Sequence, residues 1–284
     1  MIEEKKEREL AQARRDLAQK NEQAEKYRRT IELLSTIDFR AQHLRIQATR
    51  HEGTAMWLMQ ENSFIDWLNG PGSDAFCCFG IPGSGKTVLA SSIIDHMWPL
   101  YTDDNCALIF HYCEYTSEAT LDTNLILGNL TRQLIEKVGL PDPMSERIRD
   151  SYKDGLTRPP WTEVLKLLQE NICSLAKLMI VIDGVDELAK ETQESIVSVM
   201  NTFMSQSNTC IKIIICSRQE EPLIRNSFSP NPSLDITSTH LRTDISRFIE
   251  ENIEANIRSG DLTLKDPTLR DIIIQKLLEG AKEM

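Results

Sequence analysis

The segment Gly80–Thr87, which reads Gly-Ile-Pro-Gly-Ser-Gly-Lys-Thr, constrains the fold of this chain more than any other feature. It fits the pattern G-x-x-x-x-G-K-[ST], in which glycines let backbone N–H groups curl around phosphate oxygens. In this pattern the lysine reaches the β- and γ-phosphates and the final hydroxyl ligates Mg²⁺. We therefore expect a nucleoside triphosphate and Mg²⁺ to be held by Gly80, Ile81, Pro82, Gly83, Ser84, Gly85, Lys86, Thr87 and Val88.

The flanking residues are of the kind that such a loop needs. Residues 75–79 form a short apolar run of the buried-strand type, and residues 88–97 form a helical pattern with Leu89, Ile93 and Met97 on one face. A strand, a Gly-rich turn and a helix are the required context. The helix would direct its positive N-terminal end at the anion. The alternative is a Gly-rich turn that binds no ligand.

A second part of the site is expected where an acidic residue ends a buried strand. Residues 178–182 are apolar and run into Asp183, the geometry that holds Mg²⁺ beneath phosphates. Asp186 and Glu187 follow at once and are candidates to orient or deprotonate an attacking water. The alternative for Asp186 and Glu187 is a solvated helix start, where acidic residues are favoured for electrostatic reasons.

A third strand-like run, residues 211–216, is followed by Ser217 and Arg218. In open α/β sheets ligands gather at the carboxyl ends of the strands. Arg218 is therefore predicted to contact the γ-phosphate, which suits the fork geometry of a guanidinium group. The alternative is a surface arginine that pairs with Glu220 or Glu221.

Composition limits the class of protein. The 284 residues are enough for one sizeable α/β domain with additions, and the net charge of −11 argues against a nucleic-acid backbone as main partner. Several of the seven cysteines lie in apolar strand-like runs, and no C-x-x-C pair occurs, which favours a reducing compartment over zinc binding. With no signal segment and no membrane-spanning apolar run, we expect a soluble, cytoplasmic protein.

The N-terminal residues 1–35 contain no Gly or Pro and carry nine basic and eight acidic residues. Apolar residues recur every seven positions, which is a heptad pattern. Three pairs, Glu4/Arg8, Glu22/Lys26 and Glu25/Arg29, add i,i+4 support to a helix. Two structures remain open: a weak coiled coil, or a single charged helix that packs on the next domain. The heptad positions are Leu10, Leu17, Ala24 and Ile31, with Ala13, Lys20, Tyr27 and Leu34 between them.

Strand-like and helical segments alternate from residue 75 onward, which indicates a mostly parallel, five-stranded α/β sheet with helices on both faces. The region 222–232 is predicted to be a Pro-rich loop, and residues 234–237 a short edge strand. We divide the chain into a charged helix or weak coiled coil (1–35), a helical connecting segment (36–74), a nucleotide-binding core (75–258) and the start of a helical lid (259–284).

The absence of the guanine-reading motif N-K-x-D favours adenine. The run Ile182–Leu188, Ile-Asp-Gly-Val-Asp-Glu-Leu, resembles the extended acidic motif of NACHT domains, the ATPase modules of STAND-class signalling proteins. Residues 50–58, 64–68, 80–91 and 244–249 resemble the nephrocystin-like NACHT group, which is abundant in fungal proteins, often ahead of ankyrin or other repeats. The resemblance covers about residues 31–258 and implies a P-loop NTPase fold of the ASCE/AAA+-like class.

The resemblance implies a nucleotide-controlled switch of an NLR-like receptor, closed with ADP and open and self-associating with ATP. It implies that Lys86 and Thr87 bind phosphate and Mg²⁺, that Asp183 binds Mg²⁺, and that Arg218 senses the γ-phosphate. Asp186 and Glu187 would serve a slow ATP hydrolysis, and Thr54 would lie near the adenine.

One departure from the family is that the chain stops at Ala281–Met284, where relatives continue into helical and winged-helix lids and then repeats. This implies a fragment or a truncated gene product that lacks the lid residues that lock ADP. A second function therefore stays open, a non-catalytic module for interaction and oligomerisation in which the nucleotide is structural or vestigial. A metabolic kinase would need a substrate lid and an acceptor site, for which the sequence shows no feature.

Overall fold

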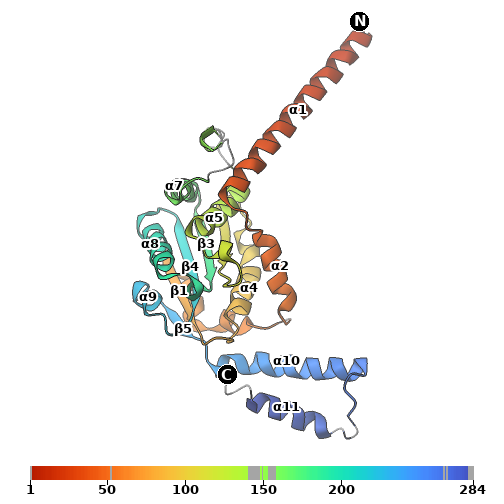
Figure 1. The fold of residues 1–284 in the computed structure, drawn as a ribbon, viewed down its shortest axis with the longest axis vertical. Coiled ribbons are helices and arrows are strands. Elements are labelled where there is room, and N and C mark those ends of the chain that lie inside the picture. The colour runs from red at the N-terminus through yellow and green to blue at the C-terminus, as the bar shows by residue number, and fades with distance from the viewer. Residues whose placement is uncertain are drawn as a thin grey trace.

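A five-stranded parallel sheet forms the centre of the protein (Figure 1). The computed structural model describes residues 2–51, 53–139, 148, 150–152, 158–264, 266 and 268–280, without the side chains of 2–10, 206 and 238. The strand order is β2-β3-β4-β1-β5, and every pairing is parallel, which confirms the predicted sheet. The strands are β1 (Asp74–Phe79), β2 (Cys106–Tyr112), β3 (Lys177–Asp183), β4 (Cys210–Ser217) and β5 (Ser233–Asp235).

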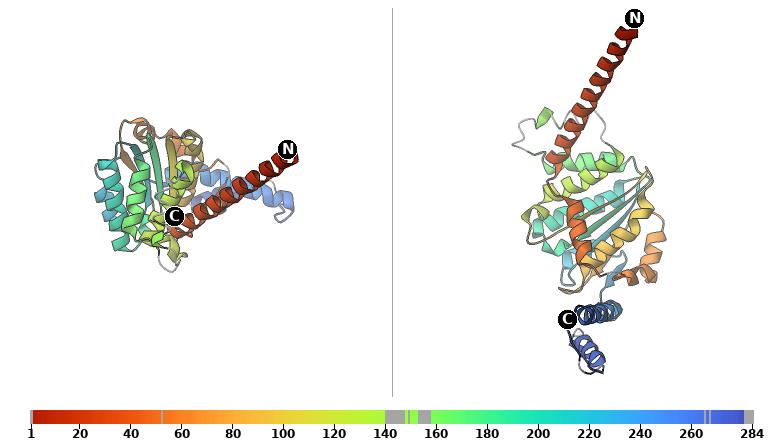
Figure 2. Two further views of the ribbon diagram at one scale, coloured as in Figure 1. Left: turned by 90° about the horizontal axis from the view of Figure 1, so that it is seen from above. Right: turned by 90° about the vertical axis from the view of Figure 1, so that its right-hand side faces the viewer.

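Helices cover both faces of the sheet because its central strands are apolar on both sides (Figures 1 and 2). Along β4, for example, Ile213 packs into the core on one face and Ile214 into the core on the other. One face carries α2 (Phe39–Thr49), α3 (Asn62–Asn69) and α4 (Lys86–Met97). The other face carries α5 (Thr123–Val138), α7 (Trp161–Ile172), α8 (Lys190–Gln206) and α9 (Pro222–Ser227). The short 3₁₀ helices of the connections are η1 (Met56–Gln60), η2 (Trp98–Tyr101), η3 (Glu118–Thr120) and η4 (Val185–Glu187).

The segment after β4 differs from the prediction of a Pro-rich loop followed by a strand at 234–237. Pro222 begins the short helix α9, because the fixed φ of proline suits the first helical position, and Ile224 is buried in the core. β5 ends at Asp235, since its partner in the ladder, β1, ends at Phe79. The end of the chain at 281–284, on which the expectation of a truncated protein rests, lies outside the described residues.

The helix α1 (Ile2–Leu34) leaves the core and touches it only with its last turns (Figure 1). Ile31 and Leu34 are buried in the core beside α5, whereas residues 11–25 are exposed. Two of the three predicted ion pairs are confirmed, Glu22–Lys26 at 2.5 Å and Glu25–Arg29 at 2.7 Å. The side chains of the third pair, Glu4 and Arg8, lie outside the described residues. The heptad pattern is therefore divided: its end packs within the chain and the remainder faces solvent.

The end of α1 crosses α5 at Gly128. A Cβ atom at Gly128 would clash with the carbonyl oxygen of Leu34, so the close approach requires glycine there. Beside this contact, Nη1 of Arg132 donates to the carbonyl oxygens of Ser35 and Ile37, each at 3.3 Å. The attachment of α1 thus depends on a missing side chain and on one guanidinium group that binds the carbonyl oxygens just after the helix.

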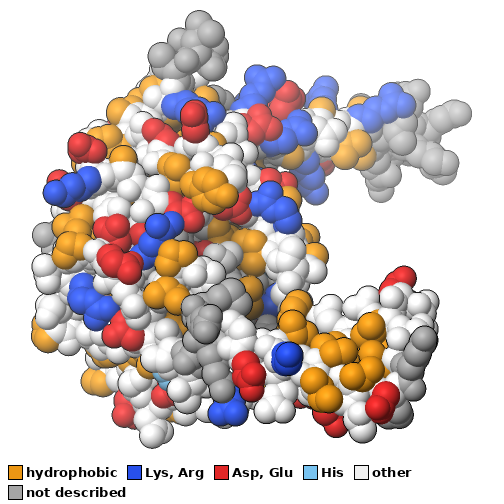
Figure 3. Space-filling model, turned by 60° about the horizontal axis from the view of Figure 1, so that its bottom comes forward, with side chains coloured by type: hydrophobic (Ala, Val, Ile, Leu, Met, Phe, Trp, Pro, Cys, Tyr) orange, Lys and Arg blue, Asp and Glu red, His pale blue; other side chains and the backbone are white. Residues whose placement is uncertain are grey.

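The helices α10 (Ser238–Ser259) and α11 (Thr268–Gly280) form a hairpin that projects from the core (Figures 1 and 2). An apolar groove of about 740 Å³ lies between them. Figure 3 shows apolar side chains gathered on one side of this hairpin. No helix in the described part of the chain is long and apolar enough to cross a membrane. The exposed large apolar residues of the hairpin are Phe248, Ile257, Leu269, Ile272 and Leu277.

The start of α10 is attached to the segment before β1 by a series of polar contacts. Asp244 Oδ2 accepts a hydrogen bond from the Ala55 N–H at 2.6 Å, and Arg247 Nη1 donates to the Gly53 carbonyl at 3.0 Å. The His240 and Trp57 rings stack with their centroids 4.7 Å apart. These contacts hold α10 against residues 53–57, which lie upstream of the phosphate loop.

His111 gives the fold a testable dependence on pH. Its ring is fully buried in β2, where Nε2 donates to the Thr120 carbonyl at 2.8 Å and Asn129 Nδ2 donates to Nδ1 at 3.0 Å. Burial lowers the pKa of His111 from 6.5 to about 4. Because the pKa of His111 in the folded protein lies below its unfolded value, the contribution of the neutral ring to the free energy of unfolding is complete above about pH 6.5. It is lost as the pH falls toward 4, by up to about 3 kcal/mol.

We expect His111→Gln to lower the free energy of unfolding at pH 7 and to flatten its decline between pH 6.5 and 4. Urea denaturation at several pH values gives the free energy of unfolding of both proteins. In the difference between the two proteins, the contributions of the other titrating groups cancel. Parallel pH profiles for the two proteins would contradict the assignment to His111.

Candidate phosphate-binding site

The loop between β1 and α4 has the geometry of a phosphate cradle. Gly83 and Gly85 adopt φ of +80° and +79°, a region that glycine occupies readily. A Cβ at Gly80 would clash with the Ser84 hydroxyl, so a larger residue there would require the Ser84 side chain to move. The Gly80 N–H donates to the Ser217 carbonyl at 3.1 Å, which ties the start of the loop to the end of β4.

Lys86, the first residue of α4, folds its side chain back over the loop. Its ammonium group donates to the carbonyl oxygens of Gly80 at 2.9 Å and Ile81 at 3.0 Å. Phosphate oxygens carry negative charge and accept such bonds more strongly than neutral carbonyls do. The arrangement therefore keeps the ammonium inside the loop, where a bound phosphate can take over its protons.

Asp183 ends β3 beneath the loop and is only 2% exposed. Burial raises the pKa of Asp183 to about 7, although a hydrogen bond from Thr87 and the charge of Lys86 act in the opposite direction. Its Oδ1 atom is buried without a hydrogen-bond partner among the described residues, and so is the Ser84 hydroxyl oxygen. A buried carboxylate oxygen without a partner is a position that a cation would satisfy.

The residues present fit Mg²⁺ in the manner of nucleotide sites. Mg²⁺ is bound there by one or two protein oxygens and completed by phosphates and water. Asp183 and Thr87 supply two such oxygens next to each other. The described part of the chain contains no cluster of three or more His, Cys, Asp or Glu residues suited to a metal, so a site made only of protein ligands is not found there.

Asp186 and Arg218 form a pair that joins the ends of β3 and β4. Asp186 Oδ1 accepts from the Arg218 N–H at 3.0 Å, and Oδ2 lies 2.8 Å from Arg218 Nε. The Asp186 side chain is 3% exposed and that of Arg218 is 48% exposed. The Asp186 side chain is therefore not solvated, unlike in the alternative of an exposed helix start. Arg218 pairs with Asp186 rather than with Glu220 or Glu221.

Glu187 lies in η4 with its carboxylate half-buried. Its Oε2 atom accepts a hydrogen bond from the Tyr115 N–H. Burial raises the pKa of Glu187, and the nearby charge of Asp186 acts in the same direction. Both oxygens of Asp186 bind Arg218, whereas the bond described for the Glu187 carboxylate, to Tyr115, uses its Oε2 atom. Of the two acidic residues, Glu187 is the better placed to accept a proton from water.

The end of β4 connects the phosphate loop to the turn at residues 184–187, a link that the sequence did not predict. Besides the bond from Gly80 to Ser217, the Gly184 N–H donates to the Cys216 carbonyl at 3.1 Å. Gly184 has φ of +73°, and a Cβ there would lie 2.7 Å from the Cys113 carbonyl oxygen. The Ser217 hydroxyl is buried without a partner among the described residues. A polar residue at a strand end, next to Arg218, was the available signal for Ser217.

Thr54 lies apart from the phosphate loop. Its hydroxyl donates to the His51 carbonyl at 2.7 Å, and its own carbonyl accepts from Ser92 Oγ, in the middle of α4, at 3.3 Å. Val88 is half-buried against the apolar cluster that Trp57 and Leu241 also contact. The structure thus brings Gly80–Thr87, Asp183, Asp186, Glu187 and Arg218 to one edge of the sheet. Thr54 is not among them, because it lies beside Ser92 in the middle of α4.

This sheet, with a Gly-rich loop after β1 and an acidic residue ending β3, defines a P-loop NTPase fold of the ASCE/AAA+-like class. A model of the family described as "Nephrocystin 3, N-terminal" matches residues 53–218. Since the match covers more than half of the chain, the chain belongs to this family, as the nephrocystin-like motifs indicated. A comparison with curated protein sequences finds no match.

Among solved structures, the fold is similar to that of Cdc6p from Pyrobaculum aerophilum, with 18% identity and a TM-score of 0.41 over 69% of this chain and 49% of that one. It is also similar to the ORC2 protein of Aeropyrum pernix, with 16% identity and a TM-score of 0.42 over 69% and 51% of the two chains. AMPPCP-bound DnaA from Aquifex aeolicus gives 14% identity and a TM-score of 0.39 over 84% and 62%. The chain spans about half the length of the first two.

Proposed function

We propose that this chain is an ATP- and ADP-binding NACHT module that acts as a nucleotide-dependent signalling switch in an NLR-like receptor, with slow Mg²⁺-dependent ATP hydrolysis. The observation that carries the proposal is the meeting of three features at one sheet edge. These are the phosphate loop with Lys86 inside it, the buried Asp183 with an oxygen left unpartnered, and the pair between Asp186 and Arg218.

Phosphate binding follows from groups that the loop already orients. The ammonium of Lys86 exchanges the carbonyls of Gly80 and Ile81 for phosphate oxygens, while backbone N–H groups at the start of α4 donate to the same anion. Thr87 and Asp183 would hold Mg²⁺, which neutralises phosphate charge when bound. Burial raises the pKa of Asp183, and a cation bound next to the carboxylate would lower that pKa again and favour the charged form.

The Arg218–Asp186 pair supports a role in telling ATP from ADP. Asp186 binds both the backbone N–H and the side chain of Arg218. The guanidinium group is half-exposed and is free to turn toward a γ-phosphate, while the backbone bond keeps the end of β4 in place. A diphosphate offers no such partner, so we expect Arg218 to stay on Asp186 when ADP is bound.

Glu187 is the residue for which we expect a selective effect on hydrolysis. Glu187→Gln removes the proton acceptor but keeps the size of the side chain, so we expect ATP turnover to fall by about 100-fold or more. The affinity for ATP should change by less than about twofold, since the hydrogen bond described for Glu187 is to Tyr115 and not to the loop. Phosphate release and nucleotide binding, both with Mg²⁺, measure the two effects. Glu220→Gln, an exposed control after β4, should leave both unchanged, and an unaltered turnover in Glu187→Gln would contradict the assignment.

We propose that a helical lid starts at residue 259, so that α11 belongs to it, whereas α10 ends the nucleotide-binding core (75–258). Support for placing α10 with the core is the attachment of Asp244 and Arg247 to residues 53–55, which lie before the loop on the side proposed for adenine. Movement of the segment 53–57 on nucleotide binding would reach α10 through these bonds. In full-length relatives a downstream repeat domain is expected beyond such a lid.

A second candidate function, self-association through α1, rests on the exposed part of this helix. Leu17 is 60% exposed at a heptad position although it is the kind of residue that helices bury against a partner. If the chain associates in this way, deleting residues 1–26 should lower the number of subunits in the assembly and leave the core folded. Tyr27 is kept because its hydroxyl donates to the Ile135 carbonyl at 3.4 Å.

Sedimentation or light scattering, with and without ATP, measures this prediction. Leu17→Asp should have the effect of the deletion, whereas Gln19→Asp, two positions along and outside the heptad seam, should not. The same number of subunits per particle in all four proteins would exclude association through α1 and leave the nucleotide-switch proposal unaffected.

A further inference from the structure

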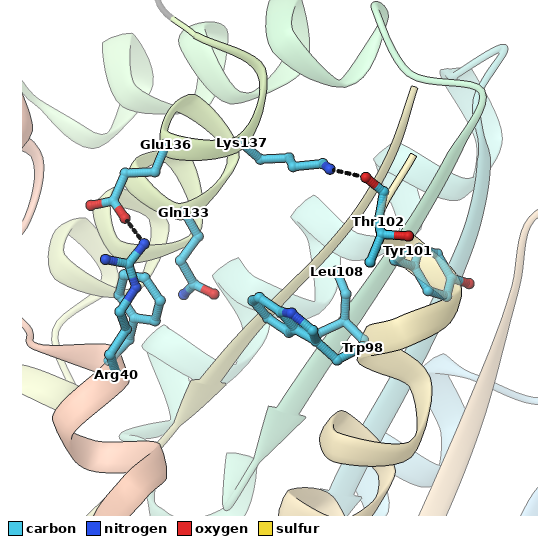
Figure 4. Close-up of a pocket in the computed structure, with 9 residues that line it drawn as sticks. Arg40, Trp98, Tyr101, Thr102, Leu108, Gln133, Glu136 and Lys137 are labelled. Atoms are coloured by element: carbon cyan, nitrogen blue, oxygen red, sulfur yellow. Dashed lines mark hydrogen bonds and ion pairs between the residues drawn. The ribbon is translucent and has the colours of Figure 1, made fainter. Parts of the chain in front are cut away.

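A second cavity lies at the β2 edge of the sheet, apart from the phosphate loop (Figure 4). It has a volume of about 220 Å³ and is framed by α2, η2 and α5. Its inner surface is apolar, since Phe39 and Leu108 line it and are 4% and 6% exposed. Trp98 also lines it although it remains 50% exposed, so a flat indole face is available at the opening.

Two buried side chains with polar atoms also line the cavity, Gln133 and Tyr101. The Tyr101 hydroxyl has no hydrogen-bond partner among the described residues, and Figure 4 shows it on the side of the ring away from Trp98. Gln133 is buried, its Oε1 accepts from the Phe110 N–H at 3.0 Å, and its Nε2 donates to the Phe110 carbonyl at 2.7 Å. These bonds hold the amide on β2. The inner part of the cavity therefore favours an apolar group, which loses no hydrogen bonds to water on entering.

Cationic side chains dominate the rim. Glu136, the acidic residue that lines the cavity, is shared by two guanidinium groups, with Arg40 Nη2 at 2.7 Å and Arg132 Nε at 2.9 Å. Lys137 Nζ donates to the Thr102 carbonyl at 2.7 Å across the opening (Figure 4). An ammonium group carries three protons, and this bond uses one. The lining thus carries two cations, Arg40 and Lys137, against the carboxylate of Glu136, which Arg132, outside the lining, also helps to neutralise. This excess of positive charge, in a chain of net charge −11, favours an anionic ligand.

We propose that this cavity binds a compound that combines an apolar ring or branched side chain with a carboxylate, either a free small acid or the C-terminal residue of a peptide. The apolar part would lie against Trp98 and Leu108, and the carboxylate would bind Lys137 and Arg40 at the rim. The volume is below the roughly 300–1,000 Å³ of typical ligand pockets, which limits the ligand to about ten non-hydrogen atoms.

The test uses the whole chain with 3-phenylpropionate as probe and 3-phenylpropylammonium as the matched cation. Saturation-transfer NMR is expected to give a dissociation constant of about 1 mM for the carboxylate, in line with its size. The cation should bind at least about tenfold more weakly. Lys137→Gln and Arg40→Gln should each weaken the carboxylate by about three- to fivefold. Lys190→Gln on α8, outside the cavity, should have no effect.

Tryptophan fluorescence locates the probe independently. The carboxylate should change the emission of the native chain, and Trp98→Phe should remove this change while keeping the NMR signal, because Phe retains an apolar wall. Equal binding of the carboxylate and the cation would overturn the proposal, as would unchanged affinity in both rim variants. Each variant is compared at an unchanged melting temperature, so that a folding defect is not read as lost binding.

Two further probes distinguish the sources of the ligand. N-acetyl-glycyl-phenylalanine presents a peptide C-terminus, and its C-terminal amide lacks the charge. Tighter binding of the free peptide than of 3-phenylpropionate supports a protein C-terminus, whereas the reverse order supports a free acid. Binding of the amide as strong as that of the free peptide contradicts a carboxylate site.

Discussion

Replacing Lys86 with alanine is expected to weaken the binding of both ATP and ADP by at least about 100-fold. Each hydrogen bond from a charged donor to phosphate contributes about 1.5–3 kcal/mol, and the Lys86 ammonium lies where it can make two. The loss of about 3 kcal/mol corresponds to about a hundredfold change in the dissociation constant. Isothermal titration calorimetry with Mg²⁺ measures the affinity for each nucleotide.

The matched control is Lys190→Ala, which removes an exposed lysine from the start of α8, and it should bind nucleotide as the native chain does. The melting temperature of Lys86→Ala without nucleotide should stay within a few degrees of the native value. Negligible binding in both the native chain and Lys86→Ala would refute the proposed function, because the loop would then be a turn without a ligand.

Gly128→Ala should destabilise the protein, although helix propensity alone predicts the opposite. In the interior of an exposed helix this change stabilises by about 1 kcal/mol. Here the new methyl group would clash with the Leu34 carbonyl, and overpacking of this kind costs about 1–3 kcal/mol or more. We expect a net loss of about 2 kcal/mol and a fall in melting temperature of about 4–8 °C.

Gly280→Ala is the natural control, because a Cβ at Gly280, in the last position of α11, meets no other group of the described residues within 4 Å beyond its own helix and chain neighbours. It should leave the melting temperature unchanged or raise it slightly. A Gly128→Ala protein that is more stable than the native chain would show that α1 does not approach α5 as closely as described. Circular dichroism during heating measures all three proteins.

The phosphate loop, Asp183 and the parallel sheet could be predicted because their signals are local. A Gly-rich turn needs particular residues at fixed spacing, and a buried strand needs a continuous apolar run, as in residues 178–182. The family motifs at 50–58 and 182–188 also depend on short stretches of sequence. These signals are strong enough to specify the fold without knowledge of distant contacts.

The remaining features depend on contacts between residues far apart in the chain. Arg218 has acidic neighbours at 220 and 221, and nothing in the local sequence favours Asp186 over them. The Gly128 contact with α1 joins segments about a hundred residues apart, and the pocket beside Trp98 is assembled from four separate elements, α2, η2, β2 and α5. Because such pairings depend on how the layers pack, they could not be read from periodicity or spacing.

The helix α1 also sets a distance. Its 33 residues, at about 1.5 Å each, extend for about 50 Å, and only its last turns are anchored on α5. A group attached near Ile2 would therefore be carried more than the radius of the core away from the nucleotide site. An α-helix of this length would act as a spacer between a group near Ile2 and the proposed nucleotide site at the sheet edge.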